Sequence, residues 1–459
     1  MQVFKKITLL FLLMFNIACS PFYNKSGIIV RGGVSDERYN VDMFHGENTF
    51  KVAMLLPLSG KSSVYGIGLK NAAMMAIEDA NNKNLVLRFF DTKSSVAGAL
   101  EAIKEASDAR VNLILGPLMS EEVSVISNKA IDERIPVISF STSPNVLKNG
   151  VYTLGLLGDE QVKRVISYAS SKQRKRIVVM VPDTTAGLNT AKSAVRNAYK
   201  YGAEVVKIGF YPADTLDFAP LVKEITNYDE RSEEISKRKK ELEKLAALGD
   251  EQAQKELKQI KNVYTTGEVD FDAVLIAETS SRLKSAAVMF GYYDIYYPDI
   301  LFLGTSVWEN TNLSKETTLY HGVYPVLSRV HNNYFIKKYE RLFGQRPNQL
   351  YSFAYDGVLL ASALSEKSQK DIYENIVDSN GYVGINGAFR IMENGTNEHS
   401  LDIVEVTSTG LRVVDKAPAK FENKILDDSD FMVESGKNDY VVANDSRVDY
   451  EEKYNFELF

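Results

Sequence analysis

The sequence predicts an α/β protein built from two lobes, each a doubly wound parallel sheet covered by helices. From residue 51 onward, short apolar runs alternate with segments whose apolar residues recur at helical spacing, the pattern of repeated βαβ units. The runs are apolar at nearly every position, as expected for strands buried on both faces of a sheet. With 459 residues, the chain is too long for one ordinary hydrophobic core, so we expect at least two.

The first βαβ unit begins with Val52 to Leu56, an apolar run of strand length. Apolar residues then recur at helical spacing between Leu69 and Ala80, and residues 86–90 form the next predicted strand. Ligands of such sheets bind at the carboxyl ends of the strands. The loop that holds Ser59 and Tyr65 lies at this end, so both residues are candidate ligand contacts.

The rest of the first series places further hydroxyl groups at the same edge. Ser120 stands at the start of a predicted helix, where we expect it to act as the cap, and Ser141 and Thr142 follow the next strand. A helix N-terminus with hydroxyls suits an anionic group such as a carboxylate, and ordinary helix capping is the alternative interpretation. The predicted elements are strands at 111–115 and 135–140 and helices at 97–107 and 121–133.

A second series of strands and helices follows Gly155 and predicts the second lobe. Glu278 and Ser306 each follow one of its strands, so they lie at the edge where a ligand would meet this lobe. The predicted strands are 177–181, 205–210, 273–277 and 300–304, and the predicted helices are 160–170, 187–200, 218–226 and 281–290.

Residues 229–261 interrupt the second series with a segment in which about half of the residues are charged. Opposite charges recur four residues apart, as in Glu233 with Lys237, and such pairs support a helix weakly. Gly249 divides the segment into a predicted helical hairpin. It is either a solvated excursion without a role or an arm that binds a partner.

The chain ends with two predicted helices, a hairpin and a polar tail. The helices are 334–343 and 353–364, and Asn394-Gly395 predicts a tight hairpin turn. Strands at 401–406 and 411–414 are the expected companions of this hairpin. Residues 418–459 are acidic, polar and without period, so we expect a mostly disordered tail.

The N-terminus predicts export and a lipid anchor. Lys5 and Lys6 precede an apolar stretch at 7–17, which is typical of a signal peptide over residues 1–18. Cys19, the single cysteine of the chain, follows a small residue as at a lipoprotein cleavage site, so its thiol is the expected lipidation site. An uncleaved anchor with an incidental cysteine is the alternative. Residues 19–50 are polar and predict a flexible tether.

Composition and motifs argue against several classes of function. A net charge of −6 and a pI near 5.6 disfavour nucleic acid as a partner. The four histidines are scattered without acidic or cysteine partners at metal-site spacing, so we expect no metal and no cofactor. Phosphate-loop and nucleophile-elbow motifs are missing from the sequence. We expect a protein that is not an enzyme, with a carboxylate-based hydrolase as a remote alternative.

Three stretches resemble the type 1 periplasmic binding proteins, whose best-known members are the leucine and branched-chain amino-acid receptors. They are Lys51 to Asp91, Leu115-Gly116-Pro117 through Ser120, and Ile135 to Pro144. The resemblance implies two lobes joined by a hinge of three crossovers, with a ligand in the cleft between the lobes. It places the crossovers near Gly155, Tyr324 and Tyr382. The implied lobe 1 is 51–155 with 325–382, and the implied lobe 2 is 156–324, with the insertion 229–261, closed by a β-hairpin at 383–417.

The same resemblance implies roles for individual residues. Ser120 and the pair Ser141-Thr142 match the first-lobe positions that meet the ligand carboxylate in amino-acid receptors. The acid that holds the ligand ammonium is expected directly after Gly304, where this chain has Thr305-Ser306-Val307. Glu278 is the available substitute for that acid.

A closer resemblance is to the penicillin-binding protein activator lipoproteins. It is carried by the lipobox, the charged insertion, and the closing segment from Gly384 to Pro418. It implies a periplasmic protein, lipid-anchored in the outer membrane rather than the inner one, that regulates peptidoglycan synthesis through a synthase. The alternative is a receptor that delivers amino acids or related solutes to an ABC permease.

Overall fold

The computed structural model describes residues 29–31, 49–328, 332–417, 421 and 439–442. The predicted signal peptide at 1–18 and the lipidation site Cys19 lie outside these residues. No helix within the described ranges is both long enough and apolar enough to cross a bilayer.

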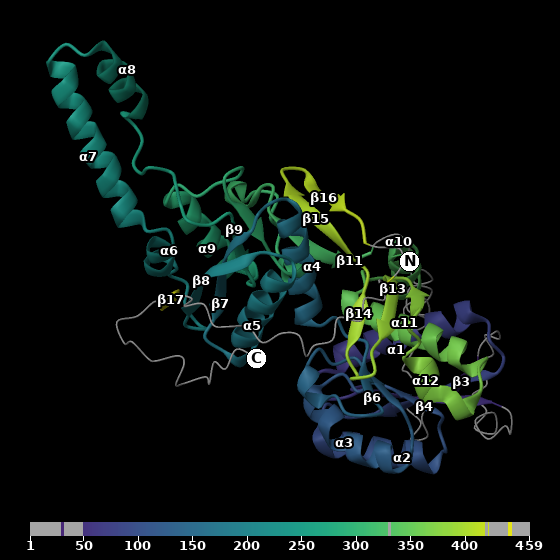
Figure 1. Ribbon diagram of the computed structural model, residues 1–459. Helices are drawn as coiled ribbons and strands as arrows, with labels where there is room; N and C mark the ends of the chain where they lie inside the picture. The colour runs from purple at the N-terminus through teal and green to yellow at the C-terminus, as the bar shows by residue number, and fades with distance from the viewer. Residues whose placement is uncertain (1–28, 32–48, 329–331, 418–420, 422–438, 443–459) are drawn as a thin grey trace, which may run out of the picture.

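Lobe 1 is built on a six-stranded sheet with the order β1-β3-β2-β4-β5-β6 (Figure 1). Strands β2 to β6 run parallel, and their central positions are fully buried because helices cover both faces. The strands are β2 (Phe50–Leu56), β3 (Leu85–Asp91), β4 (Leu113–Leu115), β5 (Val137–Ser139) and β6 (Val151–Thr153), and the helices that connect them are α1 (Ser63–Ala80), α2 (Val96–Asp108) and α3 (Ser120–Asp132).

The chain returns to lobe 1 with α10 (Asn332–Phe343), α11 (Gln349–Ser365) and the short α12 (Ile372–Ile376). Helix α11 carries few polar residues because it packs between α1 and the sheet. The contact with α1 is close, since a Cβ on Gly68 would lie 2.1 Å from the ring of Tyr351. A glycine on α1 therefore lets the two helices meet.

Lobe 2 is built on an eight-stranded sheet with the order β16-β15-β11-β10-β9-β7-β8-β17. Strands β7 to β11 run parallel, whereas β15 and β16 join antiparallel at one edge. The strands are β7 (Arg176–Pro182), β8 (Glu204–Tyr211), β9 (Ala273–Ile276), β10 (Leu301–Leu303), β11 (Val323–Leu327), β15 (Leu401–Thr407) and β16 (Gly410–Asp415). The covering helices are α4 (Gly158–Ser171), α5 (Thr185–Lys200), α6 (Ala219–Ile225) and α9 (Ser280–Tyr292). The two doubly wound lobes expected from the sequence are therefore confirmed.

The region expected to close lobe 2 with one hairpin is divided between two sheets. A separate three-stranded sheet contains β12 (Tyr382–Gly384), β13 (Gly387–Ile391) and β14 (Asn397–His399). Only β15 and β16 extend the sheet of lobe 2. The Asn394-Gly395 turn lies where the sequence predicts it, and its partner strands are β13 and β14, not β15 and β16.

The chain leaves lobe 2 close to the expected second crossover near Tyr324. Tyr324 is inside β11 with 1% of its surface exposed, and the chain leaves lobe 2 only after Leu327. The apolar run 323–327 continues past Tyr324 because it is paired on both sides by neighbouring strands.

Two short strands form in segments where the sequence predicts no structure. Strand β1 (Ile29–Arg31), inside the predicted tether, pairs antiparallel with β3, and β17 (Asp439–Val442), inside the predicted tail, pairs parallel with β8. Both are rich in β-branched residues. Each pairs with a strand that would otherwise be the edge of its sheet and would leave backbone N–H and C=O groups without partners.

The charged insertion is a helical hairpin that projects from lobe 2 (Figure 1). Its helices are α7 (Tyr228–Ala247) and α8 (Glu251–Ile260), and they are joined by Gly249 at a φ of +94°. Asp250 caps α8 by accepting the N–H groups of Gln252 and Ala253. We call this hairpin, residues 228–260, the arm.

Candidate functional site

The candidate site consists of the strand ends of the two lobes and the hinge between them. Parallel neighbours β2, β4 and β5 bring the loops of Ser59, Ser120 and Ser141-Thr142 to one edge of lobe 1. Neighbours β9 and β10 do the same for Glu278 and Ser306 in lobe 2. The topology therefore groups the sequence-predicted residues as expected, by lobe.

Ser59 is held by Asp91, which ends the neighbouring strand β3. Its hydroxyl donates to Asp91 Oδ2 at 2.6 Å, and the backbone N–H groups of Leu58 and Ser59 donate to Oδ1 at 2.9 and 3.1 Å. This carboxylate shapes the loop between β2 and α1. Tyr65, in the first turn of α1, is 44% exposed.

Ser120 does not cap α3, contrary to expectation. The helix begins at Ser120 itself, so the cap position belongs to Met119, whose side chain makes no capping bond. Glu122 in the first turn takes over the role. It bonds back to the Met119 N–H and accepts the Thr92 hydroxyl at 3.1 Å. Burial raises the pKa of Glu122 to about 7, although both hydrogen bonds act to lower it.

Ser141 and Thr142 differ in what they offer a ligand. Ser141 is 3% exposed, its Oγ accepts the Ser143 N–H at 3.1 Å, and its carbonyl accepts the Thr153 hydroxyl. Thr142 is exposed. Only Thr142 of this pair therefore presents its side chain to solvent, and Ser141 shapes the turn that carries it.

Glu278 is already neutralised within lobe 2. Its carboxylate pairs with Arg282 at 2.8 Å and accepts the Tyr211 hydroxyl at 3.1 Å, with 12% of the side chain exposed. Burial, followed by the charge of Glu278, raises the pKa of Tyr211. A ligand ammonium would have to displace Arg282 from Glu278. If both cations stayed on one partly buried carboxylate, one positive charge would lack a counter-charge.

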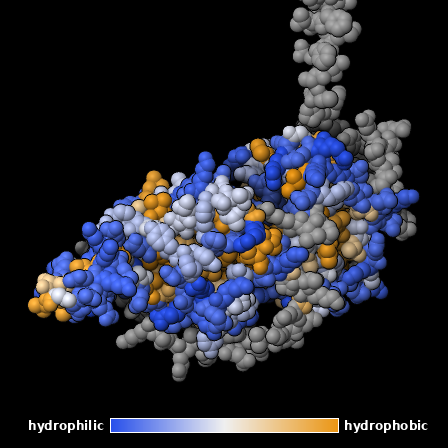
Figure 2. Space-filling model, turned by 90° about the horizontal axis from the view of Figure 1, so that it is seen from above, coloured by the Kyte–Doolittle hydropathy of each residue, from blue (hydrophilic) through white to orange (hydrophobic). Residues whose placement is uncertain are grey.

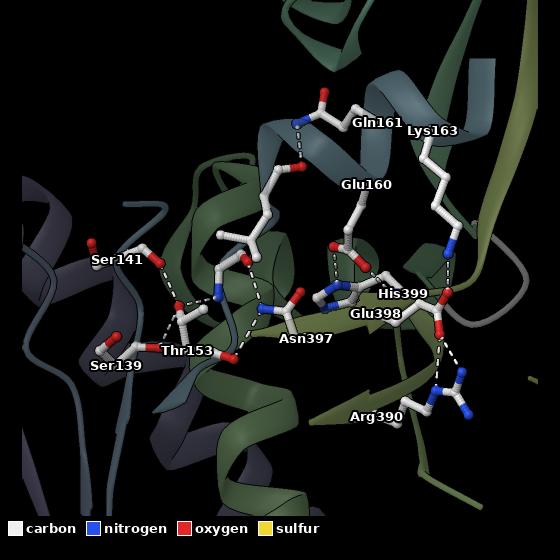
Figure 3. A network of polar contacts seen from close by, with 12 residues as sticks. Ser139, Ser141, Thr153, Glu160, Gln161, Lys163, Arg390, Asn397, Glu398 and His399 are labelled. Atoms are coloured by element: carbon white, nitrogen blue, oxygen red, sulfur yellow. Dashed lines mark hydrogen bonds and ion pairs between the residues drawn. The ribbon is translucent and has the colours of Figure 1, made fainter. Parts of the chain in front are cut away.

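Ser306 contacts the helix that follows the first crossover. Its N–H donates to Oε1 of Gln161 at 2.8 Å. Gln161 lies in the first turn of α4, directly after the first crossover (Figure 3). The contact of Ser306 is thus made by its backbone.

The hinge contains a polar network that sequence reasoning missed (Figure 3). Asn397 on β14 donates its amide to the carbonyls of Thr153 and Gly155, at 2.9 and 2.8 Å, and so binds the first crossover. Glu160 accepts the backbone N–H of His399 at 2.6 Å, with His399 Nδ1 3.2 Å from its other oxygen. No sequence signal joins these partners, because they lie more than 200 residues apart.

The hinge carboxyls are deeply buried. Burial raises the pKa of Glu160, and the facing His399 opposes that shift. On α11, burial raises the pKa of Asp356 to about 6 although it accepts the N–H groups of Ile385 and Asn386. In the described part of the chain, no three side chains of the types that ligate metals gather as a metal site.

Comparison with protein families and solved structures agrees with this architecture. Residues 49–229 match the model of the family described as "Periplasmic binding protein". A putative branched-chain amino acid ABC transporter protein from Rhodospirillum rubrum superposes with a TM-score of 0.63 at 15% identity, covering 80% of this chain and all of that one. Full-length LpoA from Haemophilus influenzae superposes with a TM-score of 0.58 at 15% identity, covering 80% of this chain and 59% of that one.

Curated sequences give shorter matches. The penicillin-binding protein activator LpoA of Histophilus somni is 27% identical over 146 residues, which is 31% of this chain and 24% of that protein. The Leu/Ile/Val-binding protein BraC3 of Rhizobium johnstonii is 25% identical over 187 residues, 38% of this chain and half of that protein. The chain therefore spans only part of the length of the curated relatives it matches. At this level of identity the comparisons establish the fold: the protein has two lobes and a hinge of the type 1 periplasmic-binding-protein fold, shared with LivK-like receptors and with LpoA.

Proposed function

We propose that this protein is a non-enzymatic lipoprotein of the cell envelope, anchored through Cys19, that regulates peptidoglycan synthesis by binding a penicillin-binding protein. The arm carries this proposal, because it projects from lobe 2 and exposes apolar side chains at its far end. The matches to LpoA support the choice of partner, since those proteins are penicillin-binding protein activators by name.

The base of the arm is fastened to lobe 2. Arg231 is 4% exposed, and its guanidinium donates to the carbonyls of Thr226 and Tyr293 at 3.3 Å and to the Thr265 hydroxyl at 3.0 Å. The ring of Tyr228 packs on that of Tyr293 with 4.7 Å between centroids. These contacts fix the direction in which the arm leaves the lobe.

Some of the charges on the shaft of the arm are paired within the arm. Arg238 on α7 pairs with Glu256 on α8 at 2.8 Å and with Glu241 at 3.0 Å, while Leu242 and Ala253 are buried between the helices. Lys239 donates to the carbonyls that follow the end of α8. The apolar seam between the helices is closed, so the sides of the shaft expose mainly polar and charged side chains.

Hydrophobic exposure is concentrated at the far end of the arm, which lies at the left of Figure 2. Leu248 is 85% exposed and Leu245 is 37% exposed. Full burial of one leucine contributes about 1.5–3 kcal/mol. The tip, residues 245–248, therefore offers an apolar anchor suited to a pocket on a partner protein.

The test is binding and activity with purified penicillin-binding proteins of the same bacterium. The full chain should bind the synthase and increase its rate of glycan polymerisation or crosslinking, and Leu248→Asp should weaken binding about tenfold or more. Leu216→Asp is the matched control, because Leu216 is 64% exposed at a site outside the arm. A full chain that neither binds nor affects the synthase would refute the regulatory function. Binding that tolerates Leu248→Asp would refute the role of the tip alone.

A solute-binding receptor is the second candidate, with an ABC permease as its partner and a small ligand between the lobes. The exposed Thr142 and Tyr65 at the edge of lobe 1 favour it. A ligand at about 100 times its Kd stabilises a protein by about 2.7 kcal/mol, which a thermal-shift screen detects. We expect no shift with amino acids, since Arg282 occupies Glu278. A clear shift with leucine, isoleucine or valine would favour the receptor function instead.

A further inference from the structure

The two edges of the sheet of lobe 2 differ in how they are covered. Strand β17 pairs with β8 at one edge, whereas β16 is the last strand at the other (Figure 1). Within the residues that the structure describes, β15 is the one strand that pairs with β16, so the outer side of β16 has no ladder partner among them. Such an edge presents a row of backbone N–H and C=O groups with which another strand can pair.

One face of β16 exposes aliphatic side chains along this edge. Leu411 and Val413 are 41% and 45% exposed, and they lie on the same face because they are two residues apart in the strand. Charged side chains protect many edge strands from pairing. In this stretch the charged residue is Arg412, which lies on the opposite face, where its Nε donates to Glu405 of β15 at 2.8 Å. The face with Leu411 and Val413 therefore lacks that protection.

A β-bulge limits the regular part of the edge to residues 410–413. Val413 pairs with Val404 and Asp415 pairs with Ile403, so Val414 is the extra residue of the bulge. So short a stretch supplies little of the about 1,200–2,000 Å² that a stable interface between folded proteins buries. The edge therefore suits a short extended segment of another protein better than a second copy of the whole chain.

A cavity of about 120 Å³ lies beside the edge, on the same face as Leu411. Its sheet side is lined by Tyr324 of β11, Val406 of β15 and Leu411, and its other side by residues of the segment 309–314. Val406 and Leu411 stand directly opposite each other in the ladder, which places both on this face of the sheet. An apolar cavity of about 150 Å³ can hold a benzene ring, so this cavity has room for one aliphatic side chain.

The open edge and the cavity together fit one kind of ligand. A strand added to β16 would lie about 4.8 Å from it, and every second side chain of that strand would stand on the face of Leu411 and the cavity. The side chains between them would stand on the face of Arg412. In strand addition, main-chain hydrogen bonds supply affinity and pockets for alternate side chains supply specificity. A small solute in the cavity would leave the backbone groups of the edge without partners.

We propose that β16 is a strand-addition site. Its edge at 410–413 binds a short extended segment of a partner protein, in which aliphatic residues alternate with polar ones. One aliphatic side chain of that segment enters the cavity beside Leu411. The proposal concerns the outer edge of lobe 2 alone and does not rest on the proposed function.

The test uses a cyclic β-hairpin peptide as the probe, with an outer strand in which valine alternates with serine. Cyclisation holds this strand extended, so binding costs little conformational entropy. Fluorescence anisotropy of the labelled peptide should show saturable binding to the full chain, and the bound peptide should slow hydrogen exchange at 410–415. The same peptide with N-methyl groups on the outward amides of its outer strand cannot donate those hydrogen bonds. It should bind at least about tenfold more weakly.

Leu411→Asp should also weaken binding of the unmethylated peptide at least about tenfold, because it places a charge beside the cavity. Val288→Asp is the matched control and should bind as wild type, since Val288 is 52% exposed on α9 of the same lobe, outside the edge.

A lack of saturable binding, or binding that tolerates either the N-methyl groups or Leu411→Asp, overturns the proposal. A dimer in sedimentation velocity that Leu411→Asp abolishes also overturns it, because the edge would then pair with a second copy of the chain. If Leu411→Asp does not fold, the methylated peptide decides the matter, since it is measured on the unchanged protein.

Discussion

Replacement of Glu122 by glutamine should make the protein less sensitive to alkaline conditions. Glu122 is 2% exposed beneath the ligand-side edge of lobe 1, and its only side-chain partner among the described residues is the Thr92 hydroxyl. Glutamine has nearly the same shape and can still accept that hydrogen bond. The substitution therefore removes the charge and leaves the packing of α3 intact.

The magnitude follows from the pKa of the folded protein. Burial raises the pKa of Glu122 from 4.5 to about 7, so the folded state favours the protonated acid. The stability that the protonated Glu122 contributes is fully present below its pKa in the unfolded state. It is lost as the pH rises through its pKa in the folded state. Between about pH 5 and about pH 8, this linkage lowers the free energy of unfolding by about 2.5 kcal/mol. Glu122→Gln lacks this contribution.

The assay is urea denaturation of both proteins at these two pH values, followed by circular dichroism. The wild-type protein should lose about 2 kcal/mol more than Glu122→Gln over this interval. Glu121→Gln is the control, because Glu121 is the exposed neighbour in the same helical turn and should behave as wild type. Equal losses in wild type and Glu122→Gln would refute the assignment of a buried, protonated acid.

Two further substitutions test the core of lobe 2 and the base of the arm. Trp308→Ala should cost about 3–5 kcal/mol, because the indole is fully buried and donates to the Ile276 carbonyl at 2.9 Å; a loss under about 1 kcal/mol by urea denaturation would contradict this packing. Arg231→Met should leave two carbonyls and a hydroxyl without their donor and so loosen the arm. Hydrogen exchange should then accelerate across 228–260 with little change elsewhere, and unchanged exchange there would show that Arg231 does not anchor the arm.

The alternation of elements was predictable because it depends on local patterns. A strand such as Val52 to Leu56 is apolar at each position because both of its faces are covered. In the charged segment 229–261, opposite charges at helical spacing predict helix. The 383–417 region was predicted to be one closing hairpin, but its strands are divided between two sheets. Which sheet a strand joins depends on distant partners, such as Asp356 binding the backbone before β13, and these leave no periodic trace in the sequence.

The candidate site was predictable only as far as strand order determines it. Ser59, Ser120 and Thr142 reach a common edge because parallel strands end together, and that much follows from topology. Whether a side chain is available to a ligand depends on its neighbours in space. Glu278 is occupied by Arg282 and Tyr211 and could not be distinguished from a free acid by sequence. The Glu160–His399 contact spans 239 residues and has no local signature.

The arm and the hinge are coupled by geometry even though their residues do not touch. Arg231 fixes the arm to lobe 2, whereas Asp356 and Asn397 fix β13 and β14 to lobe 1 and the first crossover. A helix of the length of α7 spans about 30 Å, so a rotation of the lobes by about 10° carries the tip through about 5 Å by the arm's length alone. A partner that holds both the tip and lobe 1 would therefore select one interlobe angle. A partner that holds the tip alone would bind equally well at every interlobe angle.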